Sequence, residues 1–217
     1  AWGVFGRWPP CQRREGDIVR HRIDFDQMTL PEWQALYELG LRMRERPGDF
    51  AQSCAGKLVA TLFYEPSTRT QLSFQAAALR LGAQVIGFSG TGGSSVAKGE
   101  NLKDTVRTVA NYVDAIVMRH PQEGAALAAS LFSEVPVVNA GDGGHLHPTQ
   151  TLTDLFTISL EKGRLSGLTV GICGDLLNGR TVHSLIKALV RFPGNRFVLI
   201  STPALRIPDY VRAVLQQ

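Results

Sequence analysis

The sequence contains no apolar run that approaches the roughly 20 residues of a membrane-spanning helix, which predicts a protein without a membrane partner. Cysteine is scarce and odd in number, since only Cys11, Cys54 and Cys173 occur, far apart in 217 residues. This spacing argues against a disulfide framework and against a zinc site, and it is typical of reduced thiols in the cytoplasm. The fingerprints of P-loop, dinucleotide-binding and nucleophile-elbow proteins are also absent. We therefore expect a cytoplasmic protein without a metal.

The charge balance is mildly positive, with 23 Lys and Arg residues, 19 Asp and Glu residues and a net charge of +4. The positive residues are scattered among acidic ones, without a Lys/Arg run or interleaved aromatic residues, which argues against a nucleic-acid partner. An anionic small substrate accounts for the excess equally well. Residues 1–17 have neither the apolar centre of a secretory signal nor a helical period, so we expect them to form a disordered arm.

From residue 18 onward, short apolar runs of strand length alternate with segments of helical periodicity. This alternation is typical of βαβ units and predicts an α/β fold in which a parallel sheet carries helices on both faces. The expected strands are residues 58–63, 85–88, 115–118, 135–138, 169–173 and 197–201. The expected helices are residues 28–44, 71–81, 100–112, 123–132, 149–160 and 181–190, with a short one near Asp209.

The same pattern divides the chain into parts. Residues 18–148 are expected to form a first α/β domain, residues 149–163 a connecting helix and residues 164–217 the start of a second α/β domain. The second series offers only two strands, which are too few for a stable α/β domain. We therefore expect that the chain is truncated at its C-terminus and that this impairs its activity.

Residues 67–70, with the sequence Ser-Thr-Arg-Thr, follow a buried strand and open a helix. At such a point, free backbone N–H groups and the positive end of the helix dipole converge, and hydroxyl and guanidinium donors suit phosphate oxygens. An ordinary helix cap accounts equally well for Ser67 or Thr68. It gives no reason for Arg69, because a cation in the first turn opposes the dipole. A bound anion would remove this conflict.

Polar residues also follow two later strands of the first domain. Arg119 comes after the strand expected to end at residue 118, and His147 follows the next strand across a Gly-rich turn at residues 141–144. Ligands of parallel sheets sit beyond the carboxyl ends of the strands. A surface Arg or a structural His is the commoner explanation for each residue alone, but several polar clusters at one rim favour a binding site.

Three further residues are weaker candidates. Ser94 and Lys98 lie on a Gly-rich loop, where a solvated lysine is the ordinary interpretation. Arg180 stands at a strand-turn-helix connection in the second series and could bind another anion.

Four ordered motifs resemble the aspartate branch of the transcarbamoylase family, from about residue 23 to the end of the chain. They are FYEPSTRT at residues 63–70 with Ser73 and Phe74, RHPQEG at 119–124, HPTQ at 147–150 with Asp154, Leu155 and Phe156, and GD at 174–175 with GRTVHSL at 179–185. The ornithine branch shares the first and third motifs and differs at the other two.

The resemblance implies a cofactor-free transferase of pyrimidine biosynthesis that moves the carbamoyl group of carbamoyl phosphate to the amine of L-aspartate. Ser67, Thr68, Arg69 and Thr70 would hold the phosphate, and Arg119 would bridge it to the carbonyl oxygen. Thr70, Arg119 and His147 would stabilise the oxyanion. Gln150 would orient the carbamoyl NH2 group, and Arg180 would bind an aspartate carboxylate.

The family also implies a catalytic homotrimer in which Ser94 and Lys98 reach a neighbouring subunit's site, where Lys98 also contacts aspartate. It allows a regulatory or dihydroorotase partner as well. Two positions depart from the family pattern: Gln71 replaces an Arg, and Leu177 stands where many relatives have Lys. At Gln71 we expect a lost structural contact without lost chemistry.

Three alternatives stay open on the sequence. One is an ornithine-type carbamoyltransferase. Another is a non-catalytic assembly subunit that keeps the phosphate pocket, which the short length favours and the intact Arg119, His147 and Gln150 argue against. The third is a basic nucleic-acid binder, whose affinity would fall steeply with salt.

Overall fold

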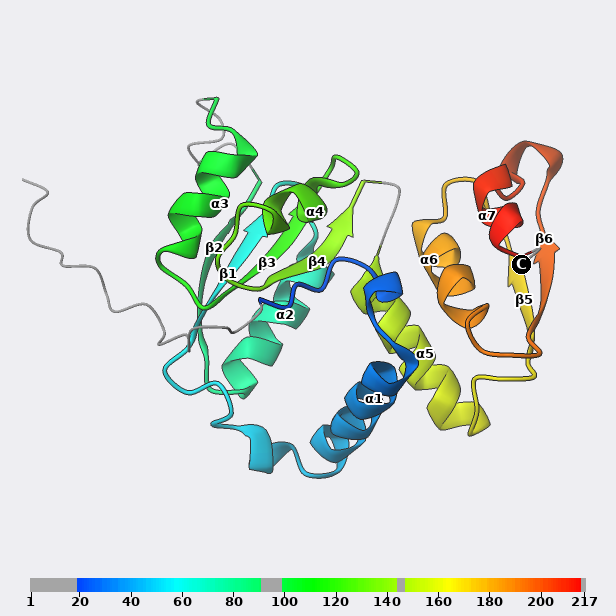
Figure 1. Ribbon diagram of the computed structural model, residues 1–217, viewed down its shortest axis with the longest axis horizontal. Coiled ribbons are helices and arrows are strands. Elements are labelled where there is room, and N and C mark those ends of the chain that lie inside the picture. The colour runs from blue at the N-terminus through cyan, green and yellow to red at the C-terminus, as the bar shows by residue number, and fades with distance from the viewer. Residues whose placement is uncertain (1–18, 91–98, 144–146, 216–217) are drawn as a thin grey trace, which may run out of the picture.

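The computed structural model describes residues 19–90, 99–143 and 147–215. Within these ranges the chain forms two parallel sheets flanked by helices, which confirms the expected α/β fold (Figure 1). The expected arm at residues 1–17, and both Ser94 and Lys98, lie outside the described residues. No helix in the described ranges is long and apolar enough to cross a membrane.

The first sheet has the strand order β2-β1-β3-β4, and its neighbouring strands are parallel. Its strands are β1 (Leu58–Phe63), β2 (Gln84–Ser89), β3 (Ala115–His120) and β4 (Val137–Asp142). On one face, Ile116 and Met118 pack with Val106 and Ala129 from two helices. On the other face, the helix that follows β1 contributes Phe74 to a cluster around residues 63, 117 and 140. Helices therefore cover both faces, as expected.

The helices around this sheet begin where the sequence provides start signals. The first helix opens with a capping box, in which the Thr29 side chain accepts from the Glu32 N–H and the Glu32 side chain accepts from the Thr29 N–H. The helices of this region are α1 (Leu30–Glu45), α2 (Thr68–Arg80), α3 (Leu102–Ala110), α4 (Ala125–Ser130) and α5 (Pro148–Lys162). Short 3-10 turns at Phe25–Gln27 and Pro47–Phe50 were not expected from the sequence.

The second sheet contains only β5 (Thr169–Cys173) and β6 (Arg196–Ile200), with α6 (Arg180–Leu189) and α7 (Asp209–Val214) beside it. In Figure 1, α5 lies between the two sheets and packs against α6. Arg191 also joins the two parts, because its guanidinium stacks over the Phe25 ring and donates to the Phe25 carbonyl oxygen at 3.0 Å. We call the part up to Lys162 the first region and the part from Thr169 onward the second region.

Strands β3 and β4 differ most from the sequence predictions, whereas β2 and β6 differ by one residue at each end. The third strand continues through Arg119 to His120, and the fourth starts at Val137 and includes Gly141 and Asp142, which had been assigned to a turn. These residues are polar or small but mostly buried, so an apolar pattern cannot reveal them as strand residues. The polar side chain of Asn139 can be buried because it donates hydrogen bonds to the Ile23 carbonyl oxygen and to the Asp142 carboxylate.

Candidate active site

The ends of β1 and β3 bring Glu65 and Arg119 together. Phe63 is the register partner of Arg119, and the Tyr64 N–H donates to the Arg119 carbonyl at 2.9 Å. The Arg119 side chain places both Nε and Nη2 at 2.7 Å from Glu65 Oε1, and the residue is only 8% exposed. Since Ser67 follows Glu65 by two residues, the start of α2 lies beside this arginine.

The start of α2 presents backbone N–H groups that its N-cap side chain leaves uncapped. Ser67 is the N-cap residue, yet its side chain accepts no hydrogen bond from the helix, and the first turn contains no acidic residue. Thr68 and Arg69 are exposed, while Ser67 and Thr70 are half-buried. The first-turn N–H groups and the positive end of the dipole are therefore open to an anion, and Arg69 adds a cation where the dipole alone would disfavour one.

Gly141 is the point at which Arg119 and His147 meet. A bulge between β3 and β4 opposes Met118 to Asn139 but His120 to Asp142, so β4 has one extra residue here. A Cβ atom on Gly141 would lie 3.3 Å from Arg119 Nη1 and 3.7 Å from His147 Cδ2, and the φ of 120° disfavours any side chain. This glycine allows the two candidate side chains to approach the same stretch of backbone.

His147 is the N-cap residue of α5 and presents an unsatisfied imidazole nitrogen. The backbone N–H of His147 donates to Ser184 Oγ at 3.3 Å. Within the described residues, the buried Nδ1 of its imidazole has no hydrogen-bond partner. Burial lowers the pKa of His147 to about 4, and the neighbouring charges of Arg180 and Arg119 act in the same direction. The imidazole is therefore neutral at neutral pH, and its orphan nitrogen is a candidate contact for a ligand.

Arg180 is the residue by which the second region reaches this site. It starts α6, and its Nη1 donates to the Gly143 carbonyl oxygen and lies 3.8 Å from Glu65 Oε1. Burial, followed by the charge of Arg119, lowers the pKa of Arg180. Two guanidinium groups thus share one carboxylate, an arrangement that an additional anion would stabilise.

The structure brings together Arg119, His147, Arg180 and the start of α2. Gln150 lies in the first turn of α5, three residues after His147, and its side-chain amide contacts Asp154. The two departures from the family pattern differ in setting, since Gln71 is half-buried and Leu177 is 43% exposed.

The sequence interpretation gave no role to Glu65 or to Ser184. Glu65 stands inside the first motif, but an acidic residue is unexpected beside an anion site, and its pairing with Arg119 spans 54 positions. Ser184 lies one helical turn after Arg180, so both are on the side of α6 that faces the first region. That helical spacing is the signal that could have identified Ser184.

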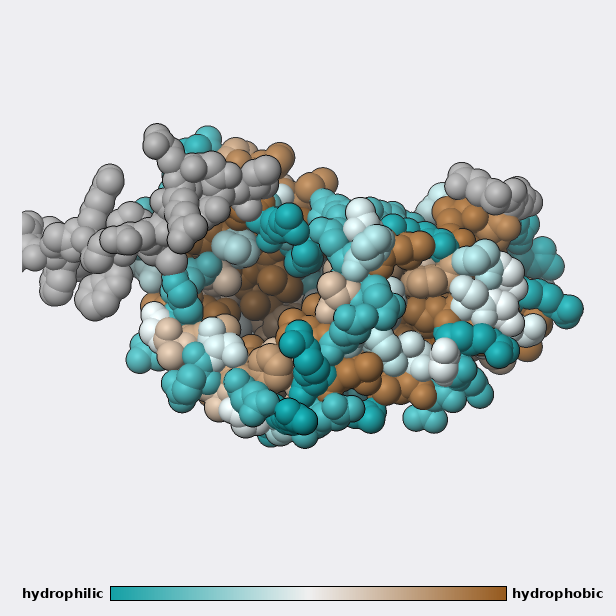
Figure 2. All heavy atoms as spheres, turned by 60° about the horizontal axis from the view of Figure 1, so that its bottom comes forward, coloured by the Kyte–Doolittle hydropathy of each residue, from teal (hydrophilic) through white to brown (hydrophobic). Residues whose placement is uncertain are grey.

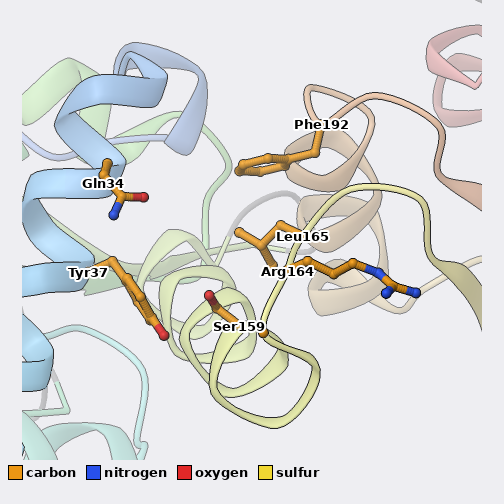
Figure 3. A pocket seen from close by; sticks show the side chains of 7 residues that line it. Gln34, Tyr37, Ser159, Arg164, Leu165 and Phe192 are labelled. Atoms are coloured by element: carbon orange, nitrogen blue, oxygen red, sulfur yellow. The ribbon is translucent and has the colours of Figure 1, made fainter.

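Two clefts lie elsewhere, along α1 and α5. One of about 290 Å³ is lined by Gln34, Tyr37 and Ser159, and the Arg164 guanidinium points away from these residues (Figure 3). Another cleft, of about 250 Å³, is apolar and includes Trp33. Figure 2 shows hydrophobic residues lining a hollow in the surface of the first region. Neither cleft gathers several cations, and the described ranges contain no cluster of three His, Cys, Asp or Glu residues that could hold a metal.

Comparison with known proteins agrees with this geometry. The chain is 58% identical over 193 residues to the aspartate carbamoyltransferase catalytic subunit of Clostridium perfringens, covering 89% of this chain and 63% of that protein. The catalytic subunit of M. jannaschii aspartate transcarbamoylase superposes with a TM-score of 0.85 at 45% identity, over 91% of this chain and 65% of that one. A Trypanosoma cruzi aspartate transcarbamoylase in complex with carbamoyl phosphate and aspartate gives a TM-score of 0.85 at 40% identity, over 91% and 66%.

The chain therefore spans slightly less than two thirds of the length of these relatives. The family model for the carbamoyl-phosphate-binding domain of aspartate/ornithine carbamoyltransferases matches residues 20–160, which contain β1 to β4 and the open start of α2. This chain belongs to the aspartate/ornithine carbamoyltransferase family.

Proposed function

We propose that this chain is the carbamoyl-phosphate-binding part of an aspartate carbamoyltransferase, which converts carbamoyl phosphate and L-aspartate to N-carbamoyl-L-aspartate and phosphate. The observation that carries the proposal is the meeting of Arg119 and His147 at Gly141, beside the open start of α2. The relatives' names support aspartate as the acceptor. So does Arg180, whose guanidinium suits a carboxylate.

In this proposal the phosphate group binds at the start of α2. The backbone N–H groups and hydroxyls of Ser67, Thr68 and Thr70 donate to its oxygens, and Arg69 adds a planar pair of donors. Arg119 contacts both the phosphate and the carbonyl oxygen. Glu65 holds Arg119 in place before the substrate arrives, since it accepts from two guanidinium nitrogens.

The reaction requires little chemistry from the protein, because carbamoyl phosphate is already activated. The amine nitrogen of aspartate attacks the carbonyl carbon, the bond from that carbon to the phosphate oxygen breaks, and the leaving phosphate accepts the amine proton. Thr70, Arg119 and the neutral imidazole of His147 donate to the oxyanion that develops. Positioning and electrostatic stabilisation supply the catalysis, and no protein nucleophile is needed.

The acceptor side combines both regions. Arg180 binds an aspartate carboxylate after leaving the Gly143 carbonyl oxygen, and Gln150 orients the carbamoyl NH2 group. Ser94 and Lys98 complete the site from a neighbouring subunit of a homotrimer, with Lys98 also contacting aspartate. Mixing Lys98→Ala and Arg69→Ala chains of the complete gene product should then restore activity that neither parent has. Mixtures as inactive as their parents would rule out the shared site.

The direct test of the acceptor is product formation by the complete gene product, with carbamoyl phosphate and either L-aspartate or L-ornithine. We expect carbamoyl-aspartate to form and citrulline to be absent. Loss of product in Arg119→Ala and in His147→Ala, with retention in the remote variant Arg80→Ala, would support the assigned site. Citrulline formation, or full activity in both site variants, would contradict the proposal.

A further inference from the structure

Gln150 and Asp154 form a side-chain pair one turn apart on α5. Gln150 Nε2 donates to Asp154 Oδ1 at 2.8 Å, and both residues are half-buried. An ionised carboxylate can only accept hydrogen bonds, so the NH2 end of the Gln150 carboxamide must face Asp154. The carbonyl end, Oε1, is therefore directed away from Asp154, and it accepts no hydrogen bond from the described residues.

The setting of Asp154 differs from that of an ordinary helix-surface pair. On α1, Gln34 Nε2 donates to Glu38 at 3.0 Å with the same spacing, but that pair is exposed. Asp154 is followed by the fully buried Leu155, and within the described ranges it has no ion pair. Burial raises the pKa of Asp154, whereas the hydrogen bond from Gln150 favours the ionised form. A half-buried carboxylate costs stability, which an apolar residue here would avoid.

The Gln150–Asp154 pair also lies close to the candidate site along α5. Gln150 is in the first turn of α5, three residues after the N-cap residue His147, and both His147 and Arg119 approach Gly141. Gln150 thus stands between the site and Asp154 along the helix. With its NH2 group held by Asp154, the carboxamide presents an acceptor on its other end.

We infer that Asp154 is a positioning residue that fixes the Gln150 carboxamide with Oε1 as the acceptor for the carbamoyl NH2 group, and so selects carbamoyl phosphate over acyl phosphates that carry a methyl group in its place. The inference rests on the proposed function of the site. If the carboxamide were turned round, two NH2 groups would face each other and the hydrogen bond would be lost. A site that hydrogen-bonds a substrate NH2 group discriminates against the analogue without it, because its own polar group is then left unpaired.

The test uses two stable phosphonates that differ only at this group: phosphonoacetamide, which has the NH2 group, and 2-oxopropylphosphonate, which has a methyl group. Calorimetric titrations of the 217-residue chain give the ratio of the two affinities. We expect the wild type to prefer phosphonoacetamide. Asp154→Leu should reduce that preference by about threefold to tenfold, the loss of one hydrogen bond, with 2-oxopropylphosphonate affinity unchanged. Asp154→Asn should keep the preference, since its side-chain oxygen can still accept from Gln150.

Glu38→Leu is the matched control, because it breaks the same kind of pair on α1 and should leave the ratio unchanged. If Asp154→Leu weakens both ligands equally or leaves the ratio intact, the positioning role is wrong while the proposed function stands. Loss of preference in Asp154→Asn as severe as in Asp154→Leu would also overturn it. If the wild type binds neither phosphonate, the proposed function fails and this inference fails with it.

Discussion

The two regions of the molecule differ in how completely they support their part of the site. The first has four strands with helices on both faces, and its sheet residues Ile116 and Met118 are fully buried. The second has two strands, and its sheet residues Val198, Leu199 and Ile200 are only partly buried or exposed. An anion pocket can therefore be rigid in the first region while the acceptor side, supplied by Arg180, rests on a thin support.

The largest effect of the difference between the two regions should appear in catalysis. The 217-residue chain should bind the phosphate ligand but form carbamoyl-aspartate at least about a thousandfold more slowly than an ordinary turnover of about 10 per second. Poor acceptor positioning is the reason, because in the described residues only two strands, β5 and β6, support the region that carries Arg180. Steady-state product assays on the purified chain measure this, and ordinary turnover would show that two strands suffice.

Core substitutions should show the same contrast in stability. Ile116 is fully buried in the first sheet, so Ile116→Ala should lower the free energy of unfolding by about 2–5 kcal/mol. Leu199 is only partly buried in the second, so Leu199→Ala should cost less than half as much. Urea unfolding followed by circular dichroism compares the two variants. Equal losses would mean that the regions are equally well packed.

Anion binding should depend on the first region. Arg69→Ala and Arg119→Ala should each weaken phosphate binding at least about tenfold, because a charge-assisted contact is worth about 1.5–3 kcal/mol. Arg80→Ala removes a cation from the last turn of α2, at the opposite end of the same helix, and should have little effect. Calorimetric titration provides the affinities. Unchanged binding in both Arg69→Ala and Arg119→Ala would disprove the pocket.

The smallest effect concerns the protonation of His147. Its folded pKa of about 4 lies below the ordinary 6.5, so the unfolded chain gains a proton before the folded chain does as the pH falls. Stability contributed by the neutral imidazole is therefore present above pH 6.5 and is lost as the pH falls towards about 4. NMR titration of the imidazole should give this low pKa, and added phosphate should raise it. A midpoint at the ordinary value, unmoved by phosphate, would contradict the buried, cation-flanked setting.

Sequence patterns predicted the fold well where strands are apolar. The strands β1 and β5 were predicted at both ends, because each is a short apolar run with a clear limit, at Lys57 before β1 and at Gly174 after β5. The ends of β3 and β4 were missed because these strands continue through the polar residues Arg119, Asn139 and Asp142. These residues are buried, and hydrogen bonds satisfy their side chains. The bulge that places Gly141 opposite Arg119 gives no signal in a single sequence.

The candidate site could be proposed from the sequence as a set of positions, but its contacts could not. Arg119, His147 and Arg180 could be selected because each follows a strand, and parallel strands end at one rim. Glu65, the carboxylate that Arg119 and Arg180 share, could not be identified, because the sequence does not show which cations an acidic residue contacts in the fold. The neutral state of His147 likewise depends on burial and on Arg180 from the other region.

The first region alone should contain the anion pocket, and NMR can test this directly. Phosphate titrated into 15N-labelled 217-residue chain should shift the backbone amides of Thr68, Arg69 and Thr70 and the side-chain Nε–H of Arg119. The amides of β5 and β6 should stay in place. Shifts concentrated in the second region, or none at the start of α2, would show that the first region does not hold the anion pocket.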